Sequence, residues 1–318
     1  MSPFSRRRRL RLARFGLFVA LAVGLGAGIT TFANSAVAPR DAAPAAVAEE
    51  PVVAGPSPVA TIEAADITWP ATGASAVAVG EGATLTSADE PHAMASITKL
   101  LTALMVLEAK PLRPGETGPD YHFVEKWNDS YEEYLYRDES ALPVPAGGTL
   151  TQYQLLQGML LGSACNYTDI LVADIWGDDA AFAAAAGEFL EEKGLGGITV
   201  VEPTGIDPAN TATPSALIEL GRLALADPVI AEIVAQSSAE LPGAGLVENT
   251  NDLLSDPGVV GIKTGTLEGS NLLSAKDIVV GERTVRVFAV VLSQADDEAR
   301  FIESRSLYAD VEALLAEG

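Results

Sequence analysis

The 318-residue chain contains the stretch Val259-Val260-Gly261-Ile262-Lys263-Thr264-Gly265-Thr266. Its first half is of strand length and rich in Val and Ile, which predicts a β-strand that continues through Lys263. Because side chains alternate across a strand, Lys263 and Gly265 lie on one face, and Thr264 and Thr266 lie on the other. Gly265 has no side chain, so another backbone can approach it closely. The stretch predicts a strand edge that can bind a peptide next to a lysine.

Two further motifs precede this strand. The first is Ser96-Ile97-Thr98-Lys99, at the start of an apolar helical pattern that stops at Pro111. Serine and lysine at this spacing share one helical face, beside the unpaired N–H groups of the helix N-terminus. Taken alone, the motif is more typical of a capping serine and a solvated lysine than of a catalytic pair. The second motif is Ser163-Ala164-Cys165-Asn166, directly after the helix that Gly162 ends.

In chain order these are Ser-x-x-Lys, a serine-containing loop and Lys-Thr-Gly, the signatures of penicillin-recognising serine enzymes. The intervals are 67 residues from Ser96 to Ser163 and 100 residues from Ser163 to Lys263. With the phrase Tyr153-Gln154-Leu155-Leu156-Gln157-Gly158-Met159-Leu160, the motifs resemble the D-alanyl-D-alanine carboxypeptidases of serine peptidase family S11. These are low-molecular-mass penicillin-binding proteins, and the motifs resemble those of the actinobacterial type. The resemblance covers residues 61–318, which are expected to form the catalytic domain.

The resemblance implies an α/β (α+β) fold of the serine β-lactamase and D,D-peptidase type. A five-stranded antiparallel sheet with flanking helices would lie next to an all-helical lobe, with the active site between them. The pattern of the chain agrees, because strand-like segments enclose a run of helices. We expect strands at Ala74–Val79, at an edge of the sheet, and at Val259–Ile262, Leu272–Val280 and Val285–Leu292, and a closing helix over 297–316.

The resemblance also implies a role for each motif. Ser96 would attack the carbonyl between two terminal D-alanines of a peptidoglycan stem peptide and form an acyl-enzyme. Lys99 would take its proton, for which it must be neutral, and Ser163 would relay a proton to the leaving amine. The substrate carboxylate would be bound by the last motif, and the N–H groups of Ser96 and Thr266 would form the oxyanion hole. That motif supplies Lys263, Thr264, Gly265 and Thr266. β-Lactam antibiotics would be covalent inhibitors, and no cofactor is implied.

The middle motif departs from the family's Ser-x-Asn, because Cys165 holds the third position and Asn166 follows one step later. A thiol is a weak donor and cannot replace both polar ends of an amide. We therefore expect Asn166 or the backbone to substitute in substrate binding, and the alternative is a slower or damaged site. Cys165 as nucleophile is disfavoured, because only His92 and His122 are available to activate it and both lie in loop-like surroundings.

Three other functions remain open. A class A serine β-lactamase would add a deacylating Glu-x-x-Leu-Asn motif. Glu202-Pro203 offers only its beginning, and Asp207-Pro208-Ala209-Asn210 after it looks like the carboxypeptidase stretch. A catalytically impaired penicillin-binding or cell-wall-binding protein would keep the fold after a loss at Cys165. A metal-dependent D,D-peptidase is disfavoured, because the chain has two histidines in unrelated contexts.

Composition and charge are those of a packed enzyme with an acidic surface. Hydrophobic residues make up 48% of the chain and charged residues 20%, and the net charge is −23. Such a surface repels phosphate backbones, which argues against nucleic acid as a partner. The stretch 121–142, rich in aromatic and acidic residues, is interpreted as a packed surface excursion, or alternatively as a border of the cleft.

The N-terminus has the pattern of a targeting element. A basic stretch from Arg6 to Arg14 precedes an uncharged run from Phe15 to Pro39, which predicts a signal peptide or membrane anchor over residues 1–38. Residues 39–60 are rich in Pro and Ala and are expected to form an extended linker. We therefore expect an extracytoplasmic protein, either secreted or attached to the membrane through its N-terminal segment alone.

Overall fold

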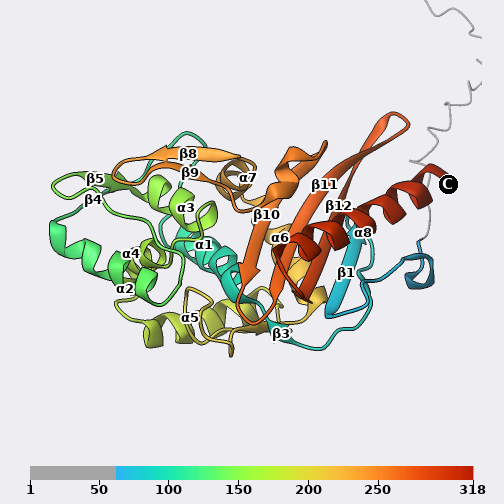
Figure 1. Cartoon of the computed structure of the whole chain (residues 1–318), viewed down its shortest axis with the longest axis horizontal. Coiled ribbons are helices and arrows are strands. Elements are labelled where there is room, and N and C mark those ends of the chain that lie inside the picture. The colour runs from blue at the N-terminus through green and yellow to red at the C-terminus, as the bar shows by residue number, and fades with distance from the viewer. Residues whose placement is uncertain (1–61, 318) are drawn as a thin grey trace, which may run out of the picture. The chain divides into compact units, whose positions relative to one another are not determined.

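A five-stranded antiparallel sheet organises residues 62–317, which are the residues that the computed structural model describes (Figure 1). The predicted leader and linker, residues 1–60, lie outside them. The order of strands across the sheet is β10–β11–β12–β1–β2. Their bounds are Ala74–Val79 for β1, Leu85–Thr86 for β2, Val259–Thr266 for β10, Ser270–Val280 for β11 and Arg283–Gln294 for β12.

The strands agree with the prediction, except for the position of β1. That strand has the predicted bounds but pairs on both sides, with Ala76 opposite Val290 of β12 and opposite Thr86 of β2. The edge is formed by β2, which has two residues and is too short to give a periodic signal. The sheet therefore joins the first strand of the described chain to the last.

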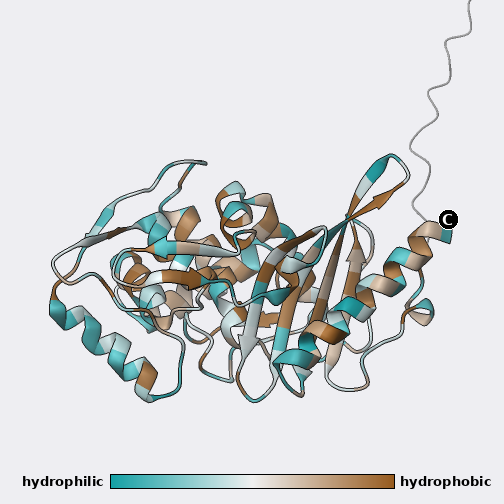
Figure 2. Ribbon diagram, turned by 45° about the horizontal axis from the view of Figure 1, so that its top comes forward, coloured by the Kyte–Doolittle hydropathy of each residue, from teal (hydrophilic) through white to brown (hydrophobic). Residues whose placement is uncertain are grey.

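Helices cover both faces of the sheet. Helix α8 (Asp297–Glu317) packs on one face, where Leu307 and Val311 meet Leu272 and Val291. Helix α6 (Pro214–Ala226) lies over the other face, and α1 (Thr98–Ala109) packs beside α6. Figure 2 shows hydrophobic residues concentrated between these layers. Alternating strand residues thus fill two separate cores, as expected for a sheet buried on both faces.

Helices also build the lobe beside the sheet, as predicted. These are α2 (Asn128–Tyr136), α3 (Gln152–Leu160), α4 (Cys165–Ile175), α5 (Asp179–Glu192) and α7 (Pro228–Val234). The lobe also contains two antiparallel strand pairs that the sequence analysis did not predict, because strands of two to four residues carry too little periodicity. They are β4 (Asp120–His122) with β5 (Thr149–Thr151), and β8 (Ser238–Leu241) with β9 (Gly245–Glu248). A small third sheet joins β3 (His92–Ala93), β7 (Thr211–Ala212) and β6 (Ile198–Thr199).

Side-chain caps define the starts of two helices. The Thr151 hydroxyl accepts from the Gln154 N–H at 3.2 Å, and the Gln154 side chain accepts from the Thr151 N–H at 2.9 Å, which completes a capping box for α3. Thr213 caps α6 through the Ala216 N–H, with Pro214 at the first helical position. Local side-chain chemistry therefore sets where these helices begin.

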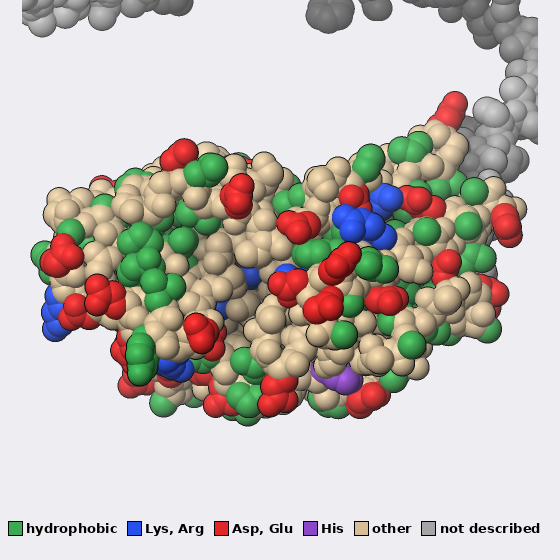
Figure 3. All heavy atoms as spheres, in the orientation of Figure 1, with side chains coloured by type: hydrophobic (Ala, Val, Ile, Leu, Met, Phe, Trp, Pro, Cys, Tyr) green, Lys and Arg blue, Asp and Glu red, His purple; other side chains and the backbone are tan. Residues whose placement is uncertain are grey.

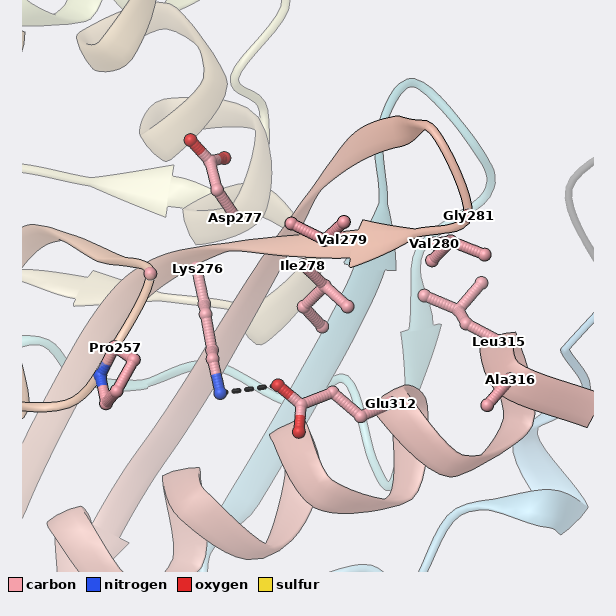
Figure 4. A pocket seen from close by; sticks show the side chains of 11 residues that line it. Pro257, Lys276, Asp277, Ile278, Val279, Val280, Gly281, Glu312, Leu315 and Ala316 are labelled. Atoms are coloured by element: carbon pink, nitrogen blue, oxygen red, sulfur yellow. Dashed lines mark ion pairs between the residues drawn. The ribbon is translucent and has the colours of Figure 1, made fainter.

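A pocket of about 840 Å³ lies at one end of the sheet, between the β11–β12 hairpin and the C-terminal half of α8 (Figure 4). Ile278, Val280 and Leu315 line it with apolar surface. Lys276 and Glu312 form an ion pair across it at 2.5 Å. Neither serine nor cysteine is among its lining residues, so this pocket holds none of the predicted nucleophiles.

Candidate active site

The Ser96 turn forms a short 3₁₀ helix, η2 (Ala95–Ile97), directly before α1. Ala95 has a φ of 49°, in the left-handed region that residues with a side chain rarely adopt. The Thr98 hydroxyl donates to the Ala95 carbonyl at 2.8 Å and holds the turn. Ala95 and Ile97 are buried whereas Ser96 is partly exposed, so the turn presents the serine hydroxyl to the surface.

Two glycines let the backbone on either side close onto this turn. A Cβ atom on Gly205 would lie 2.0 Å from the Ala95 carbonyl oxygen, and one on Gly265 would lie 2.7 Å from the Met94 oxygen. Neither contact leaves room for a side chain. The predicted close approach at Gly265 is therefore confirmed, and its partner is the backbone that carries Ser96.

Lys99 lies completely buried beside Ser96, as the second residue of α1. Its Nζ is 2.9 Å from the Ser96 Oγ and 2.6 Å from the Thr204 carbonyl oxygen, to which it donates. Within residues 62–317, no carboxylate lies within ion-pair distance of this amine. The lysine is thus positioned by neutral oxygen atoms, one of which belongs to the serine.

Glu202 organises the loop that carries Thr204. Its carboxylate accepts from the Thr204 N–H at 2.7 Å, from the Gly205 N–H at 2.6 Å and from the Asn210 amide at 2.7 Å. The Asn210 amide also donates to the Thr98 hydroxyl at 3.3 Å, which ties the loop to α1. This glutamate, considered above as part of a β-lactamase motif, is occupied by N–H donors of its own loop.

The middle motif connects α3 to α4 and places Cys165 next to Lys99. Ser163 is buried and has a φ of 58°, so the loop turns sharply at the serine. Burial raises the pKa of the Cys165 thiol, and contact with the positive Lys99 offsets this only in part. The thiol therefore stays protonated, which agrees with Cys165 not being the nucleophile.

Neither histidine is found to activate the thiol. The His92 ring nitrogen Nδ1 hydrogen-bonds the Ser293 hydroxyl at 2.9 Å, and His122 lies exposed at the end of β4.

The structure does not bring Asn166 together with the other motif residues. Its side chain accepts from the Leu142 N–H at 3.1 Å and donates to the Leu142 carbonyl at 2.7 Å. Next to it, the Cys165 N–H donates to the Ser140 carbonyl at 2.8 Å. The end of the 121–142 stretch is thereby fixed against the middle motif, so that stretch borders the candidate site instead of being a separate excursion.

Lys263 lies in β10 and is 1% exposed, with its Nζ donating to the Thr264 carbonyl at 3.2 Å. Burial, Lys99 and Arg300 together lower its pKa well below the usual lysine range. Arg300, in the first turn of α8, was missed by sequence reasoning. It is 5% exposed, and it donates to the Thr266 hydroxyl at 2.9 Å. A buried arginine so far along the chain gives no sequence signal that links it to the motif.

The two threonines of the last motif differ in their surroundings. The Thr264 hydroxyl is buried and hydrogen-bonds the Thr250 hydroxyl at 2.6 Å. Thr266 is exposed at the end of β10, where its hydroxyl contacts Arg300 and also Asp297, the latter at 3.3 Å. Of the two, only Thr266 is open to a ligand.

Together these residues form a site that has more Lys and Arg side chains than carboxylates paired with them. In Figure 3, Lys and Arg side chains lie within a hollow of the surface, with Asp and Glu side chains around it. Lys99, Lys263 and Arg300 are all buried, and Lys99 and Arg300 disfavour the charged form of Lys263. An anionic ligand at the end of β10 would relieve this repulsion.

Comparisons with known proteins agree with this arrangement. A family model described as D-alanyl-D-alanine carboxypeptidase, Peptidase_S11, matches residues 63–296. The D-alanyl-D-alanine carboxypeptidase DacB2 of Mycobacterium tuberculosis is 33% identical over 129 residues, which is 38% of this chain and 44% of that protein. This chain therefore aligns with less than half the length of that relative.

Solved structures share the fold. The Streptomyces K15 DD-transpeptidase superposes with a TM-score of 0.66 and 22% identity, covering 78% of this chain and all of the other. Penicillin-binding protein D2 of Listeria monocytogenes, solved with ampicillin bound, gives a TM-score of 0.61 and 25% identity over 75% of this chain and 96% of its own. Penicillin binding protein 6B of Escherichia coli gives 0.65 and 20%, over 81% and 79%.

Proposed function

Because this chain belongs to the D-alanyl-D-alanine carboxypeptidase family, we propose that it removes the terminal D-alanine from peptidoglycan stem peptides as a serine carboxypeptidase. The observation that carries the proposal is the 2.9 Å contact between the Ser96 hydroxyl and the buried Lys99 amine, which has no carboxylate partner within residues 62–317. A hydroxyl beside such an amine is the arrangement that a serine nucleophile needs.

In the acylation step, the Ser96 oxygen bonds to the carbonyl carbon of the penultimate D-alanine as its proton passes to the Lys99 nitrogen. The Thr204 carbonyl accepts from that amine at 2.6 Å and keeps its nitrogen beside the serine hydroxyl. The peptide C–N bond then breaks, and the departing amine takes a proton through Ser163. Water hydrolyses the acyl-enzyme and restores the serine. The overall reaction consumes one water molecule and releases D-alanine.

The negative charge that develops on the carbonyl oxygen in the transition state lies next to two backbone N–H groups. We assign the oxyanion hole to Ser96 and Thr266, which the missing side chain of Gly265 allows to lie close together. The free carboxylate of the substrate binds at the end of β10, near Lys263, Thr266 and Arg300. Its negative charge favours the protonated form of Lys263, whose pKa is low in the empty site. Binding and protonation of Lys263 thus support each other.

The substrate places the reaction outside the cytoplasm, on the cell wall. The predicted leader and linker of residues 1–60 support export, followed by secretion or attachment to the membrane. Among residues 62–317, the structure contains no helix that is long and apolar enough to span a bilayer.

The proposal is tested by release of D-alanine from a pentapeptide that ends in D-Ala-D-Ala. The full chain should release it, and labelled penicillin should leave an adduct on Ser96 that lasts minutes or longer. Rapid turnover of penicillin without a trapped adduct would instead identify a β-lactamase. Absence of both D-alanine release and adduct would identify a catalytically impaired protein.

A further inference from the structure

One carboxylate of the protein lies where the substrate carboxylate would bind. The Asp297 Oδ1 accepts from the Ser270 hydroxyl at 2.8 Å and from the Thr266 hydroxyl at 3.3 Å. The same oxygen is 3.3 Å from the Arg300 Nη1. Thr266 and Ser270 face each other across the β10–β11 pair, so three donors from two strands and one helix meet on a single oxygen atom.

Helix capping does not account for this geometry. The cap of α8 is Asp296, whose carboxylate accepts from the Ala299 N–H at 2.8 Å. Asp297 occupies the first turn, where a negative charge is favourable without any side-chain contact, and Glu298 next to it meets the same condition. The contacts of Asp297 with Thr266 and Arg300 are thus additional to what the helix requires.

The two members of the ion pair differ in their freedom to move. Arg300 is 5% exposed, whereas the Asp297 side chain is 62% exposed. Arg300 is held within the protein, while Asp297 can rotate into solvent at little cost to its own carboxylate and leave the buried Arg300 guanidinium open to a ligand carboxylate. A ligand carboxylate can therefore take its place on the same donors.

We propose that Asp297 is an intramolecular competitor that occupies the donors for the substrate's terminal carboxylate and weakens its binding. The inference rests on the proposed function, because it takes the end of β10 as the carboxylate subsite. Asp297 must leave before substrate and product carboxylates can bind, so both bind less tightly. Weakening of ground state and transition state alike raises KM and leaves kcat little changed.

The test compares Asp297→Asn with the wild type and with Glu298→Gln, which removes a first-turn charge with no contact to Arg300 among those described. For the D-Ala-D-Ala pentapeptide, Asp297→Asn should lower KM about two- to fivefold, the range of an exposed ion pair, with kcat little changed. The gap from the wild type should narrow at high salt, because the competing charge is screened. Glu298→Gln should keep the wild-type KM.

Binding without turnover provides a second readout. In the Ser96→Ala background, Asp297→Asn should lower the Kd for the dipeptide D-Ala-D-Ala by the same factor, measured by NMR titration. An unchanged or raised KM and Kd, or an equal effect of Glu298→Gln, would overturn the proposal. If the wild type releases no D-alanine, the proposed function fails, and the Kd comparison still decides whether Asp297 competes for a carboxylate.

Discussion

A lysine lies toward each end of the β10–β11 pair, but the two lysines have different surroundings. At the catalytic end, Lys263 is buried, has no carboxylate partner within residues 62–317 and lies near two other cations. At the other end, Lys276 is half-buried and forms an ion pair with Glu312 beside an apolar pocket. Lys263 thus lacks a carboxylate partner among the described residues, whereas the protein supplies one to Lys276.

This difference separates function from stability. A buried, uncompensated cation costs free energy in the empty protein, and a ligand of opposite charge recovers that cost on binding. A cation that is paired near solvent changes neither the stability of the protein nor its affinity for a ligand by much. The five predictions that follow test this contrast.

The largest effect is expected for Ser96→Ala, which removes the proposed nucleophile at the catalytic end. D-alanine release should fall by at least about 10³-fold, because no neighbouring group can replace the hydroxyl. Mass spectrometry after penicillin treatment should show no adduct. An adduct that persists in this variant would place the nucleophile elsewhere.

Lys263→Met removes the buried amine and keeps most of the side-chain volume. We expect kcat/KM for the pentapeptide to fall on the order of 100-fold, since a buried contact to a charged group is lost. The same variant should unfold at a higher temperature than the wild type, because the cost of burying an amine disappears. A less stable variant would show that the protein compensates Lys263 in the empty state.

Cys165→Asn restores the residue that the family motif has at this position. The amide can contact Lys99 and a substrate backbone, which the protonated thiol does only weakly. Activity should be retained or rise by up to about tenfold, the value of one good hydrogen bond. A large loss in D-alanine release would mean that the space beside Lys99 accommodates a thiol but not an amide.

Asp169 lies one turn after Cys165 on α4, and its carboxylate accepts from the Tyr134 hydroxyl at 2.7 Å. Burial raises its pKa to about 6 from 3.8, so the folded protein holds this proton more tightly than the unfolded chain. Its stabilising contribution is therefore full below the unfolded pKa and is lost as pH rises through 6.

The free energy of unfolding of the wild type relative to Asp169→Asn should fall on the order of 1 kcal/mol from pH 4 to pH 7. Urea denaturation at several pH values measures this difference. A difference that does not change with pH would mean that Asp169 titrates normally.

The smallest effect is expected at the far end of the sheet. Lys276→Ala breaks the ion pair with Glu312 and should cost less than about 1 kcal/mol of stability. D-alanine release should be unchanged, because the pair is separated from Ser96 by the length of β10. A change in activity would show that the two ends of the sheet are coupled.

The sequence predicted four strands of the sheet, the closing helix and the contact at Gly265, because each depends on local patterns such as alternation, apolar spacing and a missing side chain. It also placed Ser96 and Lys99 on one helical face, which the 2.9 Å contact confirms. Arg300 and Asp297 were not predicted as parts of the site, since only the packing of α8 against β10 brings them to Thr266. The orientation of the Asn166 side chain could likewise not be predicted from the sequence, because it depends on the position of the Leu142 backbone.

The pairing of β1 with β12 has a consequence for the order of events during synthesis. Ala74 lies opposite Leu292, so one side of the first strand stays unpaired until nearly the last part of the chain has been made, although β2 can pair with its other side early. The Ser96 turn likewise receives its two covering backbones from Gly205 and Gly265, far downstream. A partly made chain therefore has a serine but no active site. The complete site needs residues as far along the chain as Gly265, and such non-local pairing folds slowly.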